Sequence, residues 1–146
     1  MDETYCANYM IRHIGGELNA IANRELRNYG LTMTQARIIV YLCQHDGCIT
    51  QKALEQNLGV SHPTVVNMVA QLEHDGYVSS QVDSADRRFK IISITKKARE
   101  VSDDLMAKVQ AQDTELLRPL TETQRAHLKD ALQVIFTSME QNLQRM

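Results

Sequence analysis

The stretch that decides the fold is VSHPTVVNMVAQLEHDGYVSSQVDSADRRFKIISIT, which runs from Val60 to Thr95. It opens with Ser61 and Pro63, a pair typical of a helix start. A serine hydroxyl caps free backbone N–H groups, and proline costs little in the first turn because its N–H is not needed there. Apolar residues then recur every three or four positions up to Gly76, a residue type that commonly ends helices. The stretch therefore begins with a capped helix.

The second half of the same stretch predicts a β-hairpin. The runs 77–82 and 89–94 are rich in β-branched residues, which favour strands. Six residues, from Asp83 to Arg88, separate the two runs. A separation of this length is typical of a hairpin loop.

A shorter helix is predicted just upstream of Val60. Thr50 is its expected cap, and the very short run Cys48–Ile49 before it is a candidate strand. The turn at 58–60 joins the two helices and has Gly59 at its centre. A glycine-containing turn this short is typical of the helix-turn-helix motif.

Another helix is predicted before that motif. Thr32 is followed three residues later by Gln35, the pattern of a capping box, and the helix is expected to reach about His45. Its inward-facing residues are predicted to be Ala36, Ile39, Val40 and Cys43.

Long helices are predicted on both sides of this central region. The first runs from about Thr4 to Asn28, and the second from about Lys96 to Leu116, where Pro119 then breaks the pattern. A last helix follows Thr121. Their apolar stripes need a partner, which is either another of these helices or a second copy of the chain.

The composition favours one folded, mainly helical (α+β) domain spanning residues 1–146. The chain is 43% hydrophobic and 23% charged. No apolar run approaches the about 20 residues of a membrane span, and the acidic N-terminus does not resemble a secretory signal. The three cysteines lack the spacing of a disulfide framework, so we expect a cytoplasmic protein.

Charge is segregated along the chain although the net charge is only −2. The segment from Arg87 to Arg99 holds six basic residues and no acidic one, whereas acidic residues follow it. The distribution of charge matters more than its sum for binding a polyanion. A nucleic-acid partner is therefore compatible with this composition.

The helix after Ser61 has a polar face opposite its apolar one. Thr64, Asn67 and Gln71 lie on that face, and His62 lies at its start. Amide side chains can bind the N6 and N7 atoms of adenine in the major groove, and the helix N-terminus at Ser61 suits a phosphate. These residues are candidate contacts to duplex DNA, although an ordinary solvated face has a similar composition.

The hairpin loop supplies a second candidate contact. Arg87 and Arg88 lie at a loop tip, where core packing does not explain them. Arginine binds phosphates and narrow minor grooves. Asp86 would be repelled by phosphate, so we expect it to orient an arginine, and Lys90 lies on the returning strand. The alternative is a solubilising loop.

These residues together resemble the multiple-antibiotic-resistance regulator (MarR) family of winged helix-turn-helix proteins. The resemblance is carried by the helix-turn-helix TQKALEQNLGVSHPTVVNMVAQLEHDGYV, by the wing DSADRRFKIISIT, and by the preceding LTMTQARIIVYL. It extends over nearly the whole chain, but the flanking helices match by length and pattern rather than by motif.

The resemblance implies a division of the chain and a set of roles. Residues 32–95 would form the winged helix-turn-helix, and residues 1–30 and 96–146 the helical dimerisation region of a homodimer. Arg88 and Arg87 would contact DNA from the wing, and Asp86 would orient them. Many members have arginine where Asn67 stands, so no base preference is transferred there. The remaining implied contacts are Ser61, His62, Thr64, Asn67 and Gln71 in the recognition helix, and Gln51 and Lys52 on phosphates.

The expected function is that of a DNA-binding transcriptional regulator that acts as a repressor. It would bind a pseudo-palindromic operator as a homodimer, and an unidentified small-molecule or redox effector would release it. Alternatives are a winged-helix module for protein contacts without DNA binding, and a thiol-based redox sensor of the same family. No catalytic, phosphate-loop or cofactor motif is present in the sequence, so we expect neither an enzyme nor a cofactor.

Two cysteine-containing groups could carry other chemistry. Cys43, His45 and Cys48 have an unusual spacing for zinc and lack an obvious fourth ligand, so we expect no metal there. Cys6, Tyr9 and His13 share one face of the first helix. The resemblance allows that face to line an effector pocket or to sense oxidants, although its cysteine register does not match peroxide-sensing members, and simple dimer packing is the other possibility.

Overall fold

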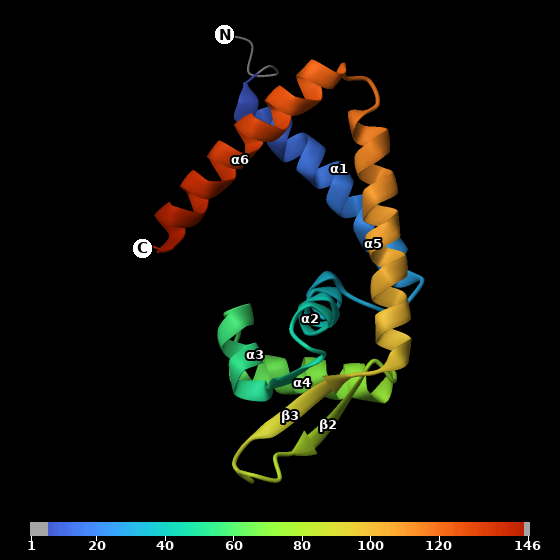
Figure 1. Cartoon of the computed structure of the whole chain (residues 1–146), viewed down its shortest axis with the longest axis vertical. Coiled ribbons are helices and arrows are strands. Elements are labelled where there is room, and N and C mark those ends of the chain that lie inside the picture. Colours follow the sequence, from blue (N-terminus) through green and yellow to red (C-terminus); the bar gives the residue numbers. More distant parts are fainter. Residues whose placement is uncertain (1–5, 145–146) are drawn as a thin grey trace. The chain divides into compact units, whose positions relative to one another are not determined.

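The computed structural model describes residues 6–144, and the fold is mainly helical with a small sheet, as predicted (Figure 1). The chain divides into two compact units, one up to Asp104 and one from Leu105 onward. The predicted start of the first helix near Thr4 lies outside the described residues. The elements are α1 (Ala7–Arg27), α2 (Met33–Gln44), β1 (Cys48–Thr50), α3 (Gln51–Leu58), α4 (His62–His74), β2 (Val78–Val82), β3 (Lys90–Ile94), α5 (Lys96–Leu117) and α6 (Glu122–Gln144).

The predicted helix caps are present. Thr32 and Gln35 form a reciprocal capping box at the start of α2, and the side chains of Thr50 and Ser61 accept hydrogen bonds from backbone N–H groups at the starts of α3 and α4. Gly59 adopts the left-handed conformation, with φ of 62°, at the end of α3. This conformation is inexpensive for glycine, so the turn between α3 and α4 can be as short as the sequence predicts.

The sheet has three antiparallel strands in the order β1-β3-β2. β3 lies in the centre, where Ile92 faces Ile49 of β1 on one side and Ser80 of β2 on the other. Ile92 is fully buried. In Figure 1 the hairpin formed by β2 and β3 lies below α4, which packs against β2.

The core of the first unit differs from the prediction in one helix. Ile38 and Leu42 of α2 are fully buried together with Ile39, whereas Val40 and Cys43 are only partly buried. The buried row is therefore rotated by about one residue from the predicted one. At the start of the helix, Gln35 turns back to the backbone of Thr32 and is itself buried. Both rows are apolar, so periodicity alone does not choose between them.

Tyr29 joins three parts of the first unit. Its backbone carbonyl accepts a hydrogen bond of 2.6 Å from the hydroxyl of Tyr77, and its own hydroxyl donates to the carboxylate of Asp104 on α5. Burial, aided by the negative charge of Asp75, raises the pKa of Tyr77. The Tyr77 hydroxyl therefore stays protonated and remains a donor.

Lys97 fixes the start of α5 to the end of α4. Its ammonium group donates to the carbonyl of Asp75 at 2.6 Å and lies 4.4 Å from the centre of the Tyr77 ring. A cation over an aromatic face is attracted by the ring's quadrupole. The junction of α4, β2 and α5 is thus held by both polar and aromatic contacts.

The second unit consists of the rest of α5 together with α6. Every described side chain of α6 from Glu122 to Leu143 is exposed, including large apolar ones such as Leu132 and Ile135. An open cavity of about 610 Å³ lies between the two helices. Its apolar lining consists of Leu116, Leu117, Ala126, Leu128, Leu132 and Phe136.

Exposed apolar residues also lie along α1. Met10, Ile14 and Ile21, three members of its predicted stripe, are exposed, and only Leu26 at the end of the helix is buried. Among residues 6–144, no helix is long and apolar enough to cross a membrane.

Candidate nucleic-acid interface

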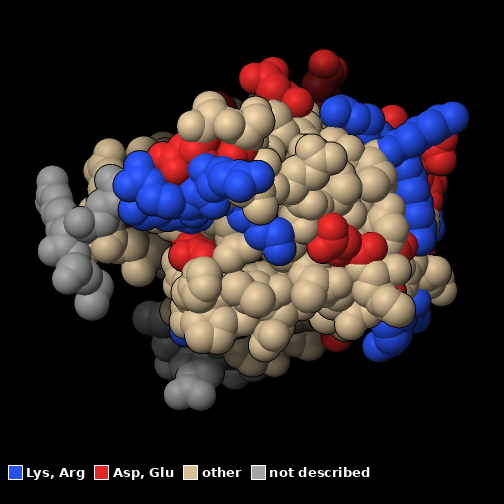
Figure 2. Space-filling view, turned by 90° about the horizontal axis from the view of Figure 1, so that it is seen from below, with Lys and Arg blue, Asp and Glu red and all other residues tan. Residues whose placement is uncertain are grey.

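One side of α4 is built to face away from the core. Val65, Val69 and Leu72 are buried, so the opposite side of this helix is exposed. That side carries the four residues His62, Thr64, Asn67 and Gln71, all exposed, and we call them the recognition row. Figure 2 views the molecule from below Figure 1, and mainly uncharged side chains occupy the centre of that face, with basic side chains toward its margins.

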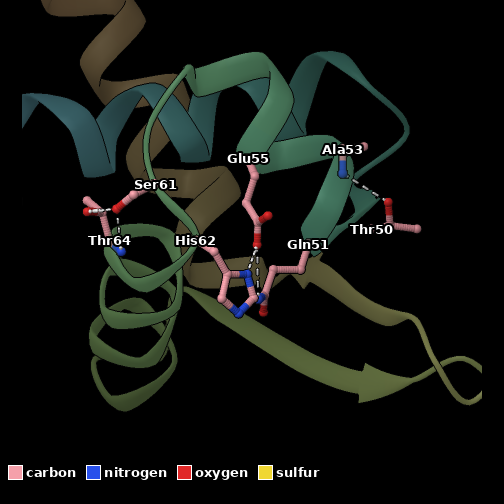
Figure 3. Close-up of polar contacts among 7 residues, drawn as sticks. All are labelled: Thr50, Gln51, Ala53, Glu55, Ser61, His62 and Thr64. Atoms are coloured by element: carbon pink, nitrogen blue, oxygen red, sulfur yellow. Dashed lines mark hydrogen bonds and ion pairs between the residues drawn. The ribbon is translucent and has the colours of Figure 1, made fainter.

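The first turn of α4 is held by its cap. The hydroxyl of Ser61 lies 2.7 Å from that of Thr64 and accepts a hydrogen bond of 3.4 Å from the Thr64 backbone N–H (Figure 3). Both side chains are exposed. Hydroxyl groups held at a helix N-terminus suit an anion such as phosphate, because the helix dipole places partial positive charge there.

The start of α3 lies beside the start of α4. Gln51 is partly buried and donates from its amide to Glu55 at 3.4 Å, whereas Lys52 is exposed. The Glu55 carboxylate also contacts Nδ1 of His62 (Figure 3). Gln51 and His62, which were predicted as separate DNA contacts, therefore both contact Glu55, a residue that was not predicted.

Gln71, at the other end of the recognition row, is held by its own helix. Its amide donates to the carboxylate of Asp75 at 3.0 Å. One amide N–H is thus engaged, while the amide oxygen still has acceptor capacity.

The loop between β2 and β3 presents an ordered arginine. The guanidinium of Arg88 donates to both carboxylate oxygens of Asp86, from Nε at 2.9 Å and from Nη2 at 2.6 Å, and the Arg88 backbone N–H donates to the same group at 3.1 Å. The Arg88 side chain is nevertheless 84% exposed. Asp86 therefore fixes the arginine without covering it.

The titration behaviour of this pair follows from the contact. Hydrogen bonds from the Arg88 side chain and backbone lower the pKa of Asp86, and the same side-chain bond raises the pKa of Arg88. Both groups stay charged at neutral pH. Arg88 also lies with its guanidinium carbon 6.0 Å from the centre of the Phe89 ring, while Arg87 and Lys90 are exposed nearby in the sequence.

The contact that ties α4 to the hairpin was not predicted from the sequence. Glu73 of α4 accepts hydrogen bonds from the backbone N–H of Ser80 at 3.0 Å and from its hydroxyl at 2.9 Å. These bonds, the one from the side chain first, lower the pKa of Glu73, and the charge of Lys90 acts in the same direction. No periodicity connects a helix residue to a strand residue seven positions later, so the pattern alone carried no signal for it.

The two cysteine-containing groups form no metal cluster among the described residues. His45 stacks on Tyr41 at 4.0 Å between ring centres, and its Nδ1 lies 2.8 Å from the Tyr41 carbonyl. Across residues 6–144, no three histidine, cysteine or acidic side chains gather as a metal site would require. Cys6 caps α1 by accepting from the Tyr9 N–H at 3.4 Å, and Tyr9 stacks on His13 with ring centres 6.0 Å apart.

Comparison with known proteins finds similarity to one family of regulators. Residues 29–88 match the MarR family. The chain is 29% identical over 117 residues to the uncharacterized HTH-type transcriptional regulator YwoH of Bacillus subtilis (strain 168), and the match covers 75% of this chain and 84% of that protein.

Solved structures agree with this match. A mutant of MepR from S. aureus is 26% identical with a TM-score of 0.83, and the S. aureus MepR–DNA complex is 26% identical with a TM-score of 0.72. Each alignment covers 92% of this chain and 99% of the other. The chain is therefore similar in sequence to HTH-type transcriptional regulators, and similar in fold to MepR.

Proposed function

We propose that the protein is a transcriptional regulator that binds duplex DNA as a homodimer and represses transcription by occluding a promoter. The observation that carries the proposal is the arrangement of its two candidate contacts. The recognition row lies on an exposed helix face, and the Asp86–Arg88 pair lies on a hairpin that Glu73 ties to the same helix. The solved DNA complex of MepR, a protein of the same fold, supports the choice of DNA as the partner.

The recognition row suits the major groove. An α-helix fits that groove, and hydroxyl, amide and imidazole groups can bind base edges there. Asn67 lies in the middle of the row with an exposed side chain. We assign the choice of sequence to His62, Thr64, Asn67 and Gln71.

The surrounding residues suit the sugar-phosphate backbone. Ser61 lies at the N-terminus of α4, and Gln51 and Lys52 lie at the start of α3, beside it. Contacts to phosphates fix the position of a protein on the duplex without reading its sequence. We assign this positioning role to all three.

The wing residues supply a contact outside the major groove. An exposed arginine held in one orientation enters a narrow minor groove at a smaller entropic cost than a mobile one. We assign this contact to Arg88, with Arg87 and Lys90 adding positive charge and Asp86 as the orienting group.

The unpartnered apolar surfaces support a homodimer. α1 and α6 both expose large apolar side chains, and the cavity between α5 and α6 extends the apolar surface of α6. Extended apolar surface of this kind marks an interaction site in a soluble protein. A second copy of the chain would cover it, and a two-fold dimer would bind two half-sites about one helical turn apart.

The effector is assigned more coarsely, as a small molecule or an oxidant that acts on the helical region. Cys6, Tyr9 and His13 are the candidate residues, because they lie on one face of α1 and carry a thiol, a phenol and an imidazole. A cytoplasmic location goes with this function.

Selection of duplexes from a randomised DNA library by the purified protein tests the proposal. We expect a pseudo-palindromic sequence to be enriched, and the binding constant to fall with salt at a log-log slope of about −0.9 per phosphate contact. A protein that enriches no sequence and shows no salt-dependent binding would instead fit a winged-helix module for protein contacts. Sedimentation of the free protein tests the dimer separately.

A further inference from the structure

A carboxylate lies inside the proposed DNA interface, where repulsion by phosphates would disfavour it. Glu55 of α3 points toward the first turn of α4 (Figure 3). One of its oxygens contacts Nδ1 of His62 and accepts from the Gln51 amide at 3.4 Å. The Glu55 side chain is 21% exposed, whereas that of His62 is 66% exposed. The acid therefore lies behind the histidine and is itself largely covered.

This contact fixes which edge of the imidazole is presented to solvent. A carboxylate only accepts hydrogen bonds, so the ring nitrogen that contacts Glu55 is the one that carries a proton. The other nitrogen, Nε2, lies on the side of the ring away from Glu55 (Figure 3). In the neutral ring, Nε2 is then an acceptor. Without Glu55, an exposed side chain at this position would be free to exchange between rotamers.

We propose that Glu55 is a positioning residue that determines DNA sequence preference through His62. The inference rests on the proposed function. When the ring is neutral, the edge that Glu55 leaves free presents an acceptor to the major groove, where the available donors are the amino groups of adenine and cytosine. The base read by His62 is therefore one that carries an amino group on that edge.

The charge of Glu55 also weakens DNA binding, and this effect does not depend on the DNA sequence. A negative charge near the duplex weakens contacts to every phosphate in range. Glu55 thus lowers the affinity for any DNA while it raises the preference for the correct base. A residue that merely supported the fold would change both affinities by the same factor.

The experiment measures the affinity of the full-length protein for two probes. One is the duplex enriched from the randomised library by the wild-type chain, and the other is a scrambled duplex of equal length and composition. The variants are Glu55→Ala, Glu55→Gln, His62→Ala and the Glu55→Ala/His62→Ala pair. Glu100→Ala is the matched control, because it removes an exposed glutamate that pairs with Lys96 on α5 and does not belong to the proposed interface.

We expect Glu55→Ala to weaken binding to the enriched duplex by about tenfold, the size of a lost charge-assisted hydrogen bond. Binding to the scrambled duplex should stay constant or tighten. Glu55→Gln keeps an acceptor for Nδ1, so it should retain most of the preference. In the His62→Ala background, Glu55→Ala should no longer alter the preference, and Glu100→Ala should leave it unchanged throughout.

Equal weakening on both probes, or a loss of preference that persists in the His62→Ala background, would overturn the inference. A repeat of the library selection with Glu55→Ala gives a second readout, because the base contacted by His62 should then become variable while the rest of the sequence is retained. A wild-type chain that enriches no duplex would overturn the proposed function itself, an outcome distinct from a wild-type preference that Glu55→Ala leaves intact.

Discussion

Glu73 on α4 accepts two hydrogen bonds from Ser80 on β2, one from the backbone N–H and one from the hydroxyl. The hydroxyl lies 2.9 Å from each of the two carboxylate oxygens. This contact ties α4 to the β2–β3 hairpin, so the position of one constrains the position of the other. Because Glu73 accepts these hydrogen bonds as a carboxylate, the strength of the contact also depends on pH.

Removal of the Ser80 hydroxyl should produce a stability difference that depends on pH. Hydrogen bonds from Ser80 lower the pKa of Glu73, so the stabilisation is present above the ordinary pKa of a glutamate and is lost as pH falls through the lowered value. Ser80→Ala should cost a few tenths of a kcal/mol near neutral pH, because the site is exposed to solvent. Urea unfolding should show the difference shrinking as the pH falls below the ordinary pKa of a glutamate. Ser79→Ala, at the exposed neighbouring position, should show no such trend.

Loss of the wing arginine should weaken DNA binding without affecting the fold. Arg88 is 84% exposed, and its side chain contacts Asp86 and the Phe89 ring in the loop itself. Arg88→Ala should cost about 1–3 kcal/mol of binding free energy on the enriched duplex. Titration of a labelled duplex measures this. Arg118→Ala removes an exposed arginine that pairs with Glu115 on α5, and equal losses for the two variants would contradict the wing assignment.

The proposed phosphate contact by Lys52 has a different signature. Lys52→Ala should weaken binding by a similar factor on every duplex and should reduce the salt slope by about one unit per subunit. Binding isotherms at several salt concentrations measure the slope. Arg118→Ala, which removes an exposed arginine paired with Glu115, is the control, and an unchanged slope for Lys52→Ala would remove this residue from the interface.

A charge in place of an exposed apolar residue of α6 should disrupt the proposed dimer. Leu132 is 45% exposed in the single chain and lines the cavity between α5 and α6. Leu132→Asp should convert the dimer to a monomer, because a carboxylate buried without a partner costs several kcal/mol. Sedimentation velocity gives the oligomeric state. Gln141→Asp, on the opposite side of the same helix, should remain dimeric, and a dimer that survives Leu132→Asp would place the interface elsewhere.

A methyl group at Gly47 should destabilise the first unit through two effects. Gly47 has φ of 78°, and an added Cβ would lie 3.0 Å from Ile94 and closer still to the Arg99 guanidinium. Gly47→Ala should cost about 1–2 kcal/mol for the left-handed conformation, with crowding added to it. Gly30→Ala isolates the conformational part, since Gly30 has φ of 67° and open space around it. Thermal melts of the two variants should therefore rank Gly47→Ala as the less stable.

Local chemistry accounts for what the sequence predicted well. The capping box of Thr32 and Gln35, the serine cap of α4 and the left-handed Gly59 each depend on residues within a few positions of one another. Such signals do not depend on contacts between elements. They therefore predicted the helix-turn-helix and the hairpin correctly.

The remaining features depend on contacts between elements. The α2 core row was predicted only in part: Ala36 and Ile39 are buried, but Ile38 and Leu42 are buried where Val40 and Cys43 were expected. Two apolar rows compete in this helix, and the elements packed against it choose between them. Glu73 and Glu55 were not predicted as site residues. In the sequence, a helical acidic residue gives the same pattern whether its side chain binds a neighbouring element or water.

Tyr29 connects α5 to the start of β2 within the first unit. Its hydroxyl engages α5 at Asp104, and its carbonyl engages Tyr77, the residue directly before β2. Rotation of α5 about its own axis at this point would therefore shift the root of the wing. Tyr29 thus links α5 to the residue before β2. Replacing it by phenylalanine would remove the hydrogen bond to Asp104, while its backbone carbonyl would still accept from Tyr77.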